Sequence, residues 1–369
     1  MMIWQFGPLT VSVTGVGAVY EALAAELGSL PVLSLPDATE QRADVEFRFV
    51  GALDSAPETI QVGRWRLADN LVARRGHGYE FSMRREEGRF IVSIAADSID
   101  GSALYRTYRK VWDWNFLTPS ETIAKNIMYN LFDLVTGAAF LEKDATYLHA
   151  STCSREDEAL ALIAWGGVGK TTSVLKLVTE EGWRFMSDDL GLVDAAGTLF
   201  RTPKRLQVYA YNVAGQPELF RRVMQGRGLA DRTNWHWRLA RFGDKKVRRR
   251  IGAEELFGRE NVAGSATLTE AIFLERADVS KLSWSDLSAE ELARRSATIL
   301  VDELNVLFEL VVAAESHGVD TGLGTLDELR ERSKAVLKRA LKGKPTRCLH
   351  LPLDTGPDEL AAALCDRPV

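Results

Sequence analysis

The segment that most constrains the fold is a glycine-rich turn between two stretches of different periodicity. Ala159–Trp165 is a short apolar run, Gly166–Gly169 contains three glycines, and Lys170–Thr179 has a buried side and a stop at Gly182. These patterns predict a strand, a tight loop and a helix. With a further strand at Trp183–Met186, the order strand, loop, helix, strand predicts an α/β domain.

The loop carries the residue types that bind phosphate. It matches the Walker A pattern at Gly169, Lys170 and Thr171, whereas Ala164 replaces the first glycine, which is acceptable if its φ is negative. Phosphate needs converging backbone N–H donors, which glycines and a helix start provide. Lys170 would place its charge at the outer phosphates, and Thr171 would place a hydroxyl on Mg²⁺. The predicted nucleotide-binding residues are Gly166, Gly167, Val168, Gly169, Lys170, Thr171 and Thr172.

Two adjacent carboxylates, Asp188 and Asp189, follow the strand predicted at Trp183–Met186. Mg²⁺ bound to a nucleotide needs hard oxygen ligands, and an acidic residue at the end of a second strand commonly supplies one. One carboxylate would hold the metal while its neighbour takes the proton of an attacking hydroxyl. A solvent-facing turn or a helix cap is the alternative, and the phosphate loop nearby favours the functional interpretation.

The chain divides by pattern into two predicted domains. Residues 1–144 are strand-rich and predict a smaller α+β domain of unknown role, and residues 145–369 form the α/β domain.

The aromatic and basic segment Tyr105–Phe116 is interpreted as an edge strand, with a partner surface as the alternative. A capping box at Thr118–Glu121 starts a helix. Its four-residue stripe predicts a core face: Ile123, Ile127, Leu131 and Val135.

Bulk composition excludes several classes of protein. A net charge of −5 gives no global attraction to nucleic acid, and no apolar stretch reaches the about 18 residues of a membrane span. Three cysteines without a Cys-x-x-Cys pair argue against a disulfide framework and a structural zinc site. The N-terminus lacks the basic and apolar regions of a signal peptide, so the cytoplasm is the expected location.

Four segments in order resemble the HPr kinase/phosphorylase superfamily, in particular its divergent kinases. Three of them are the phosphate loop, the Asp188-Asp189 pair and Leu148-His149-Ala150, where His149 precedes Lys170 by 21 residues. The fourth is Thr202-Pro203-Lys204-Arg205. The resemblance covers roughly residues 146–364 and implies an α/β P-loop kinase domain of the HPr kinase type.

The resemblance implies a kinase that transfers the γ-phosphoryl group of ATP to a hydroxyl, with Mg²⁺ as cofactor. It implies Asp188 as the general base, Asp189 as a metal ligand together with Thr171, and His149 orienting the base or the phosphate. The reverse assignment of Asp188 and Asp189 is the alternative. A satisfied core histidine is the alternative for His149. Leu199–Tyr209 lacks the family's acidic strand motif, so neither phosphorylase activity nor HPr as substrate is carried over.

Residues 221–250 contain eleven Arg or Lys against two acidic residues. One interpretation is a lid or acceptor-binding loop that brings Lys246, Arg248, Arg249 and Arg250 to the transferred phosphate, because guanidinium groups bind phosphoryl oxygens bidentately. RNA or DNA binding, with tryptophan stacking on bases, is less favoured. A solvated helix face is the third interpretation.

The acceptor is expected to be a serine of a protein or peptide, or a small-molecule alcohol. The main alternative function is a nucleotide-binding switch that hydrolyses slowly and acts through protein partners. A phosphoenolpyruvate carboxykinase-like enzyme is disfavoured, since matching metal-ligand histidines and a lysine are missing. A homo-oligomer is expected from the family, and ATP is favoured over GTP.

Overall fold

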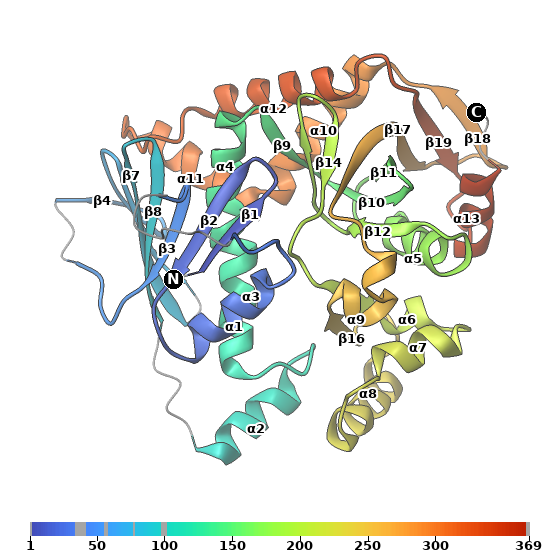
Figure 1. Cartoon of the computed structure of the whole chain (residues 1–369), viewed down its shortest axis with the longest axis horizontal. Coiled ribbons are helices and arrows are strands. Elements are labelled where there is room, and N and C mark those ends of the chain that lie inside the picture. Colours follow the sequence, from blue (N-terminus) through green and yellow to red (C-terminus); the bar gives the residue numbers. More distant parts are fainter. Residues whose placement is uncertain (1, 34–41, 55–57, 77, 97–101, 367–369) are drawn as a thin grey trace.

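The computed structural model describes residues 2–33, 42–54, 58–76, 78–96 and 102–366. Their strands form two large sheets and a small ribbon, and Figure 1 shows the large sheets toward opposite sides of the molecule, with helices between and around them. The chain therefore has the mixed α/β architecture that the sequence predicts. None of the described helices combines the length and apolar character needed to cross a membrane.

The first sheet comes from the N-terminal part of the chain. Its eight strands are β1 (Met2–Phe6), β2 (Leu9–Thr14), β3 (Val45–Phe49), β4 (Ile60–Val62), β5 (Trp65–Ala68), β6 (Leu71–Arg75), β7 (Tyr79–Glu86) and β8 (Arg89–Ala96). They lie in the order β1-β2-β3-β8-β7-β6-β5-β4. Only β2–β3 and β3–β8 are parallel among these described pairs, so a largely antiparallel sheet is built from local hairpins.

The second sheet has nine strands. They are β9 (Ala145–Leu148), β10 (Ala150–Arg155), β11 (Glu158–Ile163), β12 (Arg184–Ser187), β13 (Gly191–Asp194), β14 (Thr198–Phe200), β17 (Ser265–Arg276), β18 (Ser283–Asp286) and β19 (Thr346–Leu351). The order is β12-β10-β11-β17-β14-β13-β9, and β19 lies between β17 and β18. β11, β17 and β19 run parallel, so their carboxyl ends open onto one edge of the sheet.

Helices cover both sheets. In the N-terminal part they are α1 (Ala18–Leu27), α2 (Ala103–Trp112), α3 (Pro119–Ile127), the π-helical turn η1 (Met128–Phe132) and α4 (Asp133–Glu142). Those that follow the phosphate loop are α5 (Lys170–Glu180), α6 (Ala210–Val213), α7 (Pro217–Val223), α8 (Leu229–Phe242), α9 (Ala253–Phe257), the 3-10 turn η2 (Arg259–Asn261), α10 (Ala289–Glu303), α11 (Asn305–Glu315), α12 (Leu326–Ala340) and α13 (Pro357–Cys365). The ribbon pairs β15 (Leu206–Tyr209) with β16 (Arg248–Ile251).

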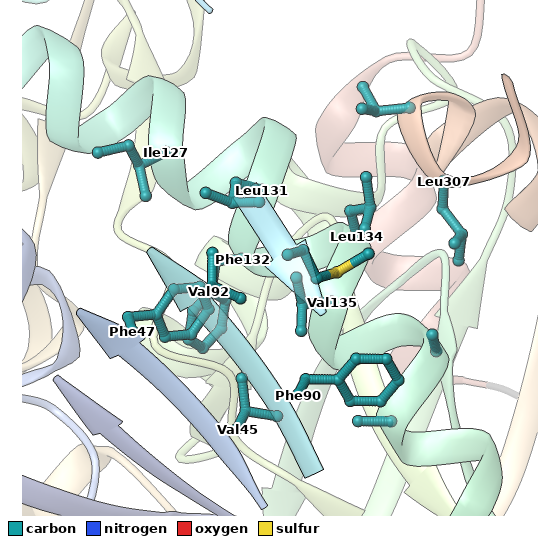
Figure 2. Close-up of a cluster of buried hydrophobic side chains, with 14 of the residues drawn as sticks. Val45, Phe47, Phe90, Val92, Ile127, Leu131, Phe132, Leu134, Val135 and Leu307 are labelled. Carbon is teal, nitrogen blue, oxygen red and sulfur yellow. The ribbon is translucent and has the colours of Figure 1, made fainter. Parts of the chain in front are cut away.

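The consecutive helical elements α3, η1 and α4 bury the apolar stripe predicted for one helix. Thr118 and Glu121 form the expected capping box at the start of α3. Figure 2 shows Ile127, Leu131 and Val135 in one buried cluster with β-sheet side chains. Leu307 of α11 joins the same cluster, so a helix from late in the chain completes this core. The division between residues 144 and 145 stays a prediction.

Two local predictions are wrong. The segment Tyr105–Phe116 was expected to be an edge strand, but Ala103–Trp112 forms helix α2, capped by Ser102. Its aromatic residues recur at helical spacing, as in Tyr108 and Trp112, whose rings lie 6.2 Å apart. The second concerns the apolar stretch 297–314, whose interspersed charged residues predict one amphipathic helix. It is divided between α10 and α11 around Leu304.

Candidate active site

The phosphate loop joins β11 to α5, the arrangement expected from the sequence. Gly167 has a φ of 78° and Gly169 a φ of 118°, values that L side chains rarely adopt, so both glycines are required by the turn. Ala164 is not among the residues with positive φ, which meets the condition for alanine at the first position. The loop therefore directs the free N–H groups of the helix start toward one point.

The side chain of Lys170 folds back onto the loop and binds two of its carbonyl oxygens. Its Nζ donates to the carbonyl oxygens of Ala164 at 2.6 Å and Trp165 at 3.1 Å. Burial lowers the pKa of Lys170 to about 8, although the carboxylates of Asp188, Asp189 and Glu303 act in the opposite direction. A buried ammonium group beside a ring of backbone donors is an arrangement suited to binding an anion.

Asp188 connects the phosphate loop to the paired-carboxylate motif. The Thr171 hydroxyl lies 2.9 and 3.1 Å from its two carboxylate oxygens, and the Ser151 hydroxyl donates at 2.5 Å. Burial raises the pKa of Asp188, while these two hydrogen bonds lower it and Asp189 raises it further. Thr172, in contrast, accepts a hydrogen bond from Asn212 at 2.9 Å, which fixes α6 to α5.

Asp189 faces a different set of partners. Its φ of 72° is unusual for a residue other than glycine. The carboxylate is 47% exposed and lies 3.7 Å from Lys204 Nζ. One ligand atom each of His149, Asp189 and Glu303 lie within 4.8 Å of one another. This set of an imidazole and two carboxylates could accept a divalent cation or relay a proton.

His149 is a buried residue with a close acidic neighbour. Its Nδ1 is 2.8 Å from Glu303 Oε1, but the two groups are not aligned as a directed hydrogen bond. The ring therefore has an incompletely satisfied nitrogen beside Asp189. Glu303, at the end of α10, has no sequence motif, and only the fold brings it to this position.

Lys204 is the functional candidate that sequence reasoning left without a role. Its Nζ lies 2.8 Å from Asp133 Oδ2 and 4.6 Å from the centre of the Tyr129 ring. Burial opposes its charge, but Asp133 and Asp189 outweigh this effect and raise the pKa of Lys204. Burial also raises the pKa of Asp133 to about 6, against the effect of Lys204. Asp133 directly follows η1, and π-helical turns are frequent at functional sites.

These groups surround a small polar cavity of about 150 Å³. The side chains that line it are Tyr129, Thr171, Asp188, Asp189, Lys204, Arg205, Gln207, Tyr209 and Tyr211. The structure thus brings together the helix start, both aspartates and Lys204 around one space. Two carboxylates and a buried ammonium group in such a space can bind a hydroxyl, take its proton and offset negative charge.

The lid predicted from the basic segment is not a loop at positions 248–250, and Arg249 and Arg250 are held in buried ion pairs. Arg248, Arg249 and Arg250 belong to strand β16, paired with β15, rather than to a loop. Arg249 donates to Asp231 at 2.7 Å, and Arg250 forms a bidentate pair with Glu26 at 2.9 and 3.0 Å. Both side chains are buried, because these long-range carboxylates compensate their charges.

The remaining basic residues differ in position. Arg248 lies beside the cavity, 3.3 Å from the Tyr209 hydroxyl. Lys246 is exposed in the preceding turn. Trp235 is buried and is not available to stack on a base, whereas Trp237 is about half exposed on α8.

A second, larger cavity of about 460 Å³ adjoins the phosphate loop. Trp165 and Val168 of the loop border it, together with Phe273 on β17 and Thr298 and Ile299 on α10. It lies at the edge where the parallel strands end, the usual position for ligands in open α/β sheets.

Comparisons with known proteins give no family and low similarity to solved structures. No family model matches the chain. No curated protein matches it either. Among solved structures, the HPr(Ser) kinase/phosphatase from Coxiella burnetii is similar over 60% of this chain and 95% of its own, with 11% sequence identity and a TM-score of 0.27. A likeness with that TM-score carries no argument about fold or activity.

Proposed function

We propose that this protein is a P-loop kinase that transfers the γ-phosphoryl group of ATP to a hydroxyl. The observation that carries the proposal is the shared cavity in which Thr171, at the start of α5, meets Asp188, Asp189 and Lys204. A phosphate loop alone would equally suit a nucleotide-binding switch. A carboxylate pair and a buried lysine beside that loop favour transfer to an acceptor.

The nucleotide would lie across the loop. Its phosphates would accept hydrogen bonds from the backbone N–H groups at the start of α5 and from Lys170 once that side chain leaves the carbonyls of Ala164 and Trp165. The larger cavity beside Trp165 and Phe273 has room for a nucleotide base. Its lining is apolar at Trp165, Val168, Phe273, Leu274 and Ile299, and charged at Glu275, Arg276, Arg294 and Arg295.

The residues present fit Mg²⁺. Thr171 and Asp188 offer a hydroxyl and a carboxylate 2.9 Å apart, both hard oxygen donors. The sequence prediction paired Thr171 with Asp189, but the Thr171 hydroxyl contacts Asp188, so we assign Asp188 to the metal. When bound, Mg²⁺ would neutralise charge on the β- and γ-phosphate oxygens.

Asp189 then becomes the general base. Its side chain is 47% exposed and borders the cavity where an acceptor hydroxyl would enter. It would take the acceptor proton as the acceptor oxygen forms a bond to the γ-phosphorus and the bond between that phosphorus and the bridging oxygen of ADP breaks. Lys204, held by Asp133, would neutralise charge on the transferred group. His149 and Glu303, whose ligand atoms lie within 4.8 Å of that of Asp189, would orient its carboxylate.

The test is transfer of label from γ-labelled ATP with Mg²⁺ to a host lysate separated into protein and small-molecule fractions. Label on a defined protein or metabolite with the wild-type chain, and none with Lys170→Ala, supports the kinase. Label released only as inorganic phosphate, or nucleotide bound without turnover, supports the switch instead. Excess unlabelled GTP that suppresses transfer as well as excess ATP does would contradict the preference for ATP.

A further inference from the structure

A second group of metal-ligand side chains lies on β17 and β19. Glu275, Cys348 and His350 each place one ligand atom within 4.8 Å of the other two. Cys348 Sγ is 3.8 Å from Glu275 Oε2 and 3.9 Å from His350 Nδ1. Donor atoms bound to one tetrahedral zinc ion at about 2.0–2.3 Å are themselves roughly 3.3–3.8 Å apart. A small contraction would therefore bring all three donors to zinc-binding distance.

The backbone holds the three side chains on one face of the sheet. β17 and β19 are parallel neighbours, with Glu275 in register with His350 and Phe273 in register with Cys348. Residues two apart on a strand share a face, so Glu275, Cys348 and His350 all project to the same side. Ligands placed on paired strands are more precisely positioned than ligands on loops.

The histidine is oriented by a third strand. Ser285 on β18 places its Oγ 2.9 Å from His350 Nε2. With Nε2–H donating to Ser285, the lone pair of Nδ1 is left to face Cys348. Metal-binding histidines commonly have such a partner on the second ring nitrogen.

The surrounding charges suit a divalent cation. Arg295 donates to Glu275 at 3.3 Å and to Glu291 at 2.8 Å. With a divalent cation bound, its two positive charges would face the Cys348 thiolate and the Glu275 carboxylate, which together carry two negative charges, as a partly buried site requires. Glu291 accepts hydrogen bonds from both Arg294 and Arg295, so it belongs to the surrounding ion pairs and not to the ligand set.

We propose that Glu275, Cys348 and His350 bind a single zinc ion, with a remaining position for water or another ligand. Thiolate, imidazole and carboxylate together favour zinc over Mg²⁺, which takes oxygen ligands. The missing Cys-x-x-Cys pair does not bear on this site, because its ligands come from two strands. Glu275 also lines the cavity beside Trp165 and Phe273 that the kinase proposal assigns to the nucleotide base, but the zinc test below does not depend on nucleotide binding.

The test uses the metal-free full-length protein titrated with Co²⁺, which reports ligand type by absorption. We expect one Co²⁺ per chain, a near-ultraviolet thiolate-to-cobalt band, and loss of that band when Zn²⁺ is added. Cys348→Ser should abolish the band. Ser285→Ala, which keeps all three ligands, should weaken Co²⁺ binding by roughly 10- to 100-fold.

Cys365→Ser is the matched control, since Cys365 is exposed at the end of α13 and is not one of the three clustered residues. It should leave the band unchanged, and circular dichroism should verify that each variant is folded. A band that persists in Cys348→Ser or disappears in Cys365→Ser would overturn the proposal. So would cobalt binding without any thiolate band, because the metal would then be held elsewhere.

Discussion

The Thr171 hydroxyl lies 2.9 and 3.1 Å from the two carboxylate oxygens of Asp188 and bridges the start of α5 to the end of β12. Neither motif alone specifies this contact. It occurs because β10 pairs with both β11 and β12, which places the ends of these two strands close together. The pair thereby forms the oxygen-rich position at which a cation on a nucleotide would be held.

Removing the Thr171 hydroxyl should weaken the use of Mg²⁺. Thr171→Ala is expected to raise the Mg²⁺ concentration needed for half-maximal transfer by at least about tenfold, because one ligand and its bond to Asp188 are lost. Thr171→Ser retains the hydroxyl and should remain close to wild type. The measurement is a Mg²⁺ titration of phosphoryl transfer at saturating ATP; equal Mg²⁺ curves for alanine and serine would exclude a role for this oxygen.

The two aspartates should fail in different ways. Asp189→Asn should lower kcat by about 10²–10⁴ while leaving ATP affinity near wild type, since only proton removal is lost. Asp188→Asn should mainly raise the Mg²⁺ requirement. Steady-state kinetics and Mg²⁺ titrations on both variants separate these effects. The reversed pattern would restore Asp188 as the base and Asp189 as the metal ligand.

Nucleotide affinity should decrease as the pH rises through about 8. Burial lowers the pKa of Lys170 to about 8 in the free protein, and bound phosphate would favour the charged form. Binding therefore takes up a proton above this pH, and affinity is highest below it. Calorimetric titration with ATP across this range provides the measurement. Lys170→Ala should bind weakly with no such step, and an unchanged step in that variant would assign it to another group.

The buried pair of Asp133 and Lys204 should dominate local stability. Asp133→Asn leaves the Lys204 ammonium without its 2.8 Å partner and should cost about 3–5 kcal/mol in free energy of unfolding. Lys204→Met should cost a similar amount. The double variant Asp133→Asn/Lys204→Met should be less destabilised than the sum of the two, because no unpaired charge remains. Urea unfolding measures all three, and strict additivity would show that the pair is not coupled.

Two residues of the basic segment should differ in their effect on the free energy of unfolding. The buried Arg249 should be important for stability, and the exposed Lys246 should not. Arg249→Ala removes a buried guanidinium 2.7 Å from Asp231 and should destabilise the protein by about 3–5 kcal/mol. Lys246→Ala, at an exposed position, should change stability by less than about 0.5 kcal/mol. Thermal unfolding of both variants is the measurement. Wild-type stability of Arg249→Ala with impaired transfer would revive a phosphate-binding role.

Local features of the chain, including the glycines of the site, could be predicted from the sequence because short-range sterics and hydrogen bonding determine them. The glycines of the phosphate loop take the positive φ values that only glycine tolerates well. Capping boxes begin α3 at Thr118 and α12 at Thr325. The stripe from Ile123 to Val135 is a core face since apolar residues recur with the helical period.

The partners of charged residues, in contrast, cannot be predicted from their neighbours in the sequence. The sequence showed that residues 221–250 are basic, but only the fold pairs Arg250 with Glu26, 224 positions away. Likewise, the chain topology alone brings Glu303 to His149 and Asp133 to Lys204. The sequence by itself thus determined the phosphate loop, the helices that start at caps and the apolar stripe. Tertiary structure decided which carboxylates meet which cations, because Coulombic attraction depends on distance in space and not along the chain.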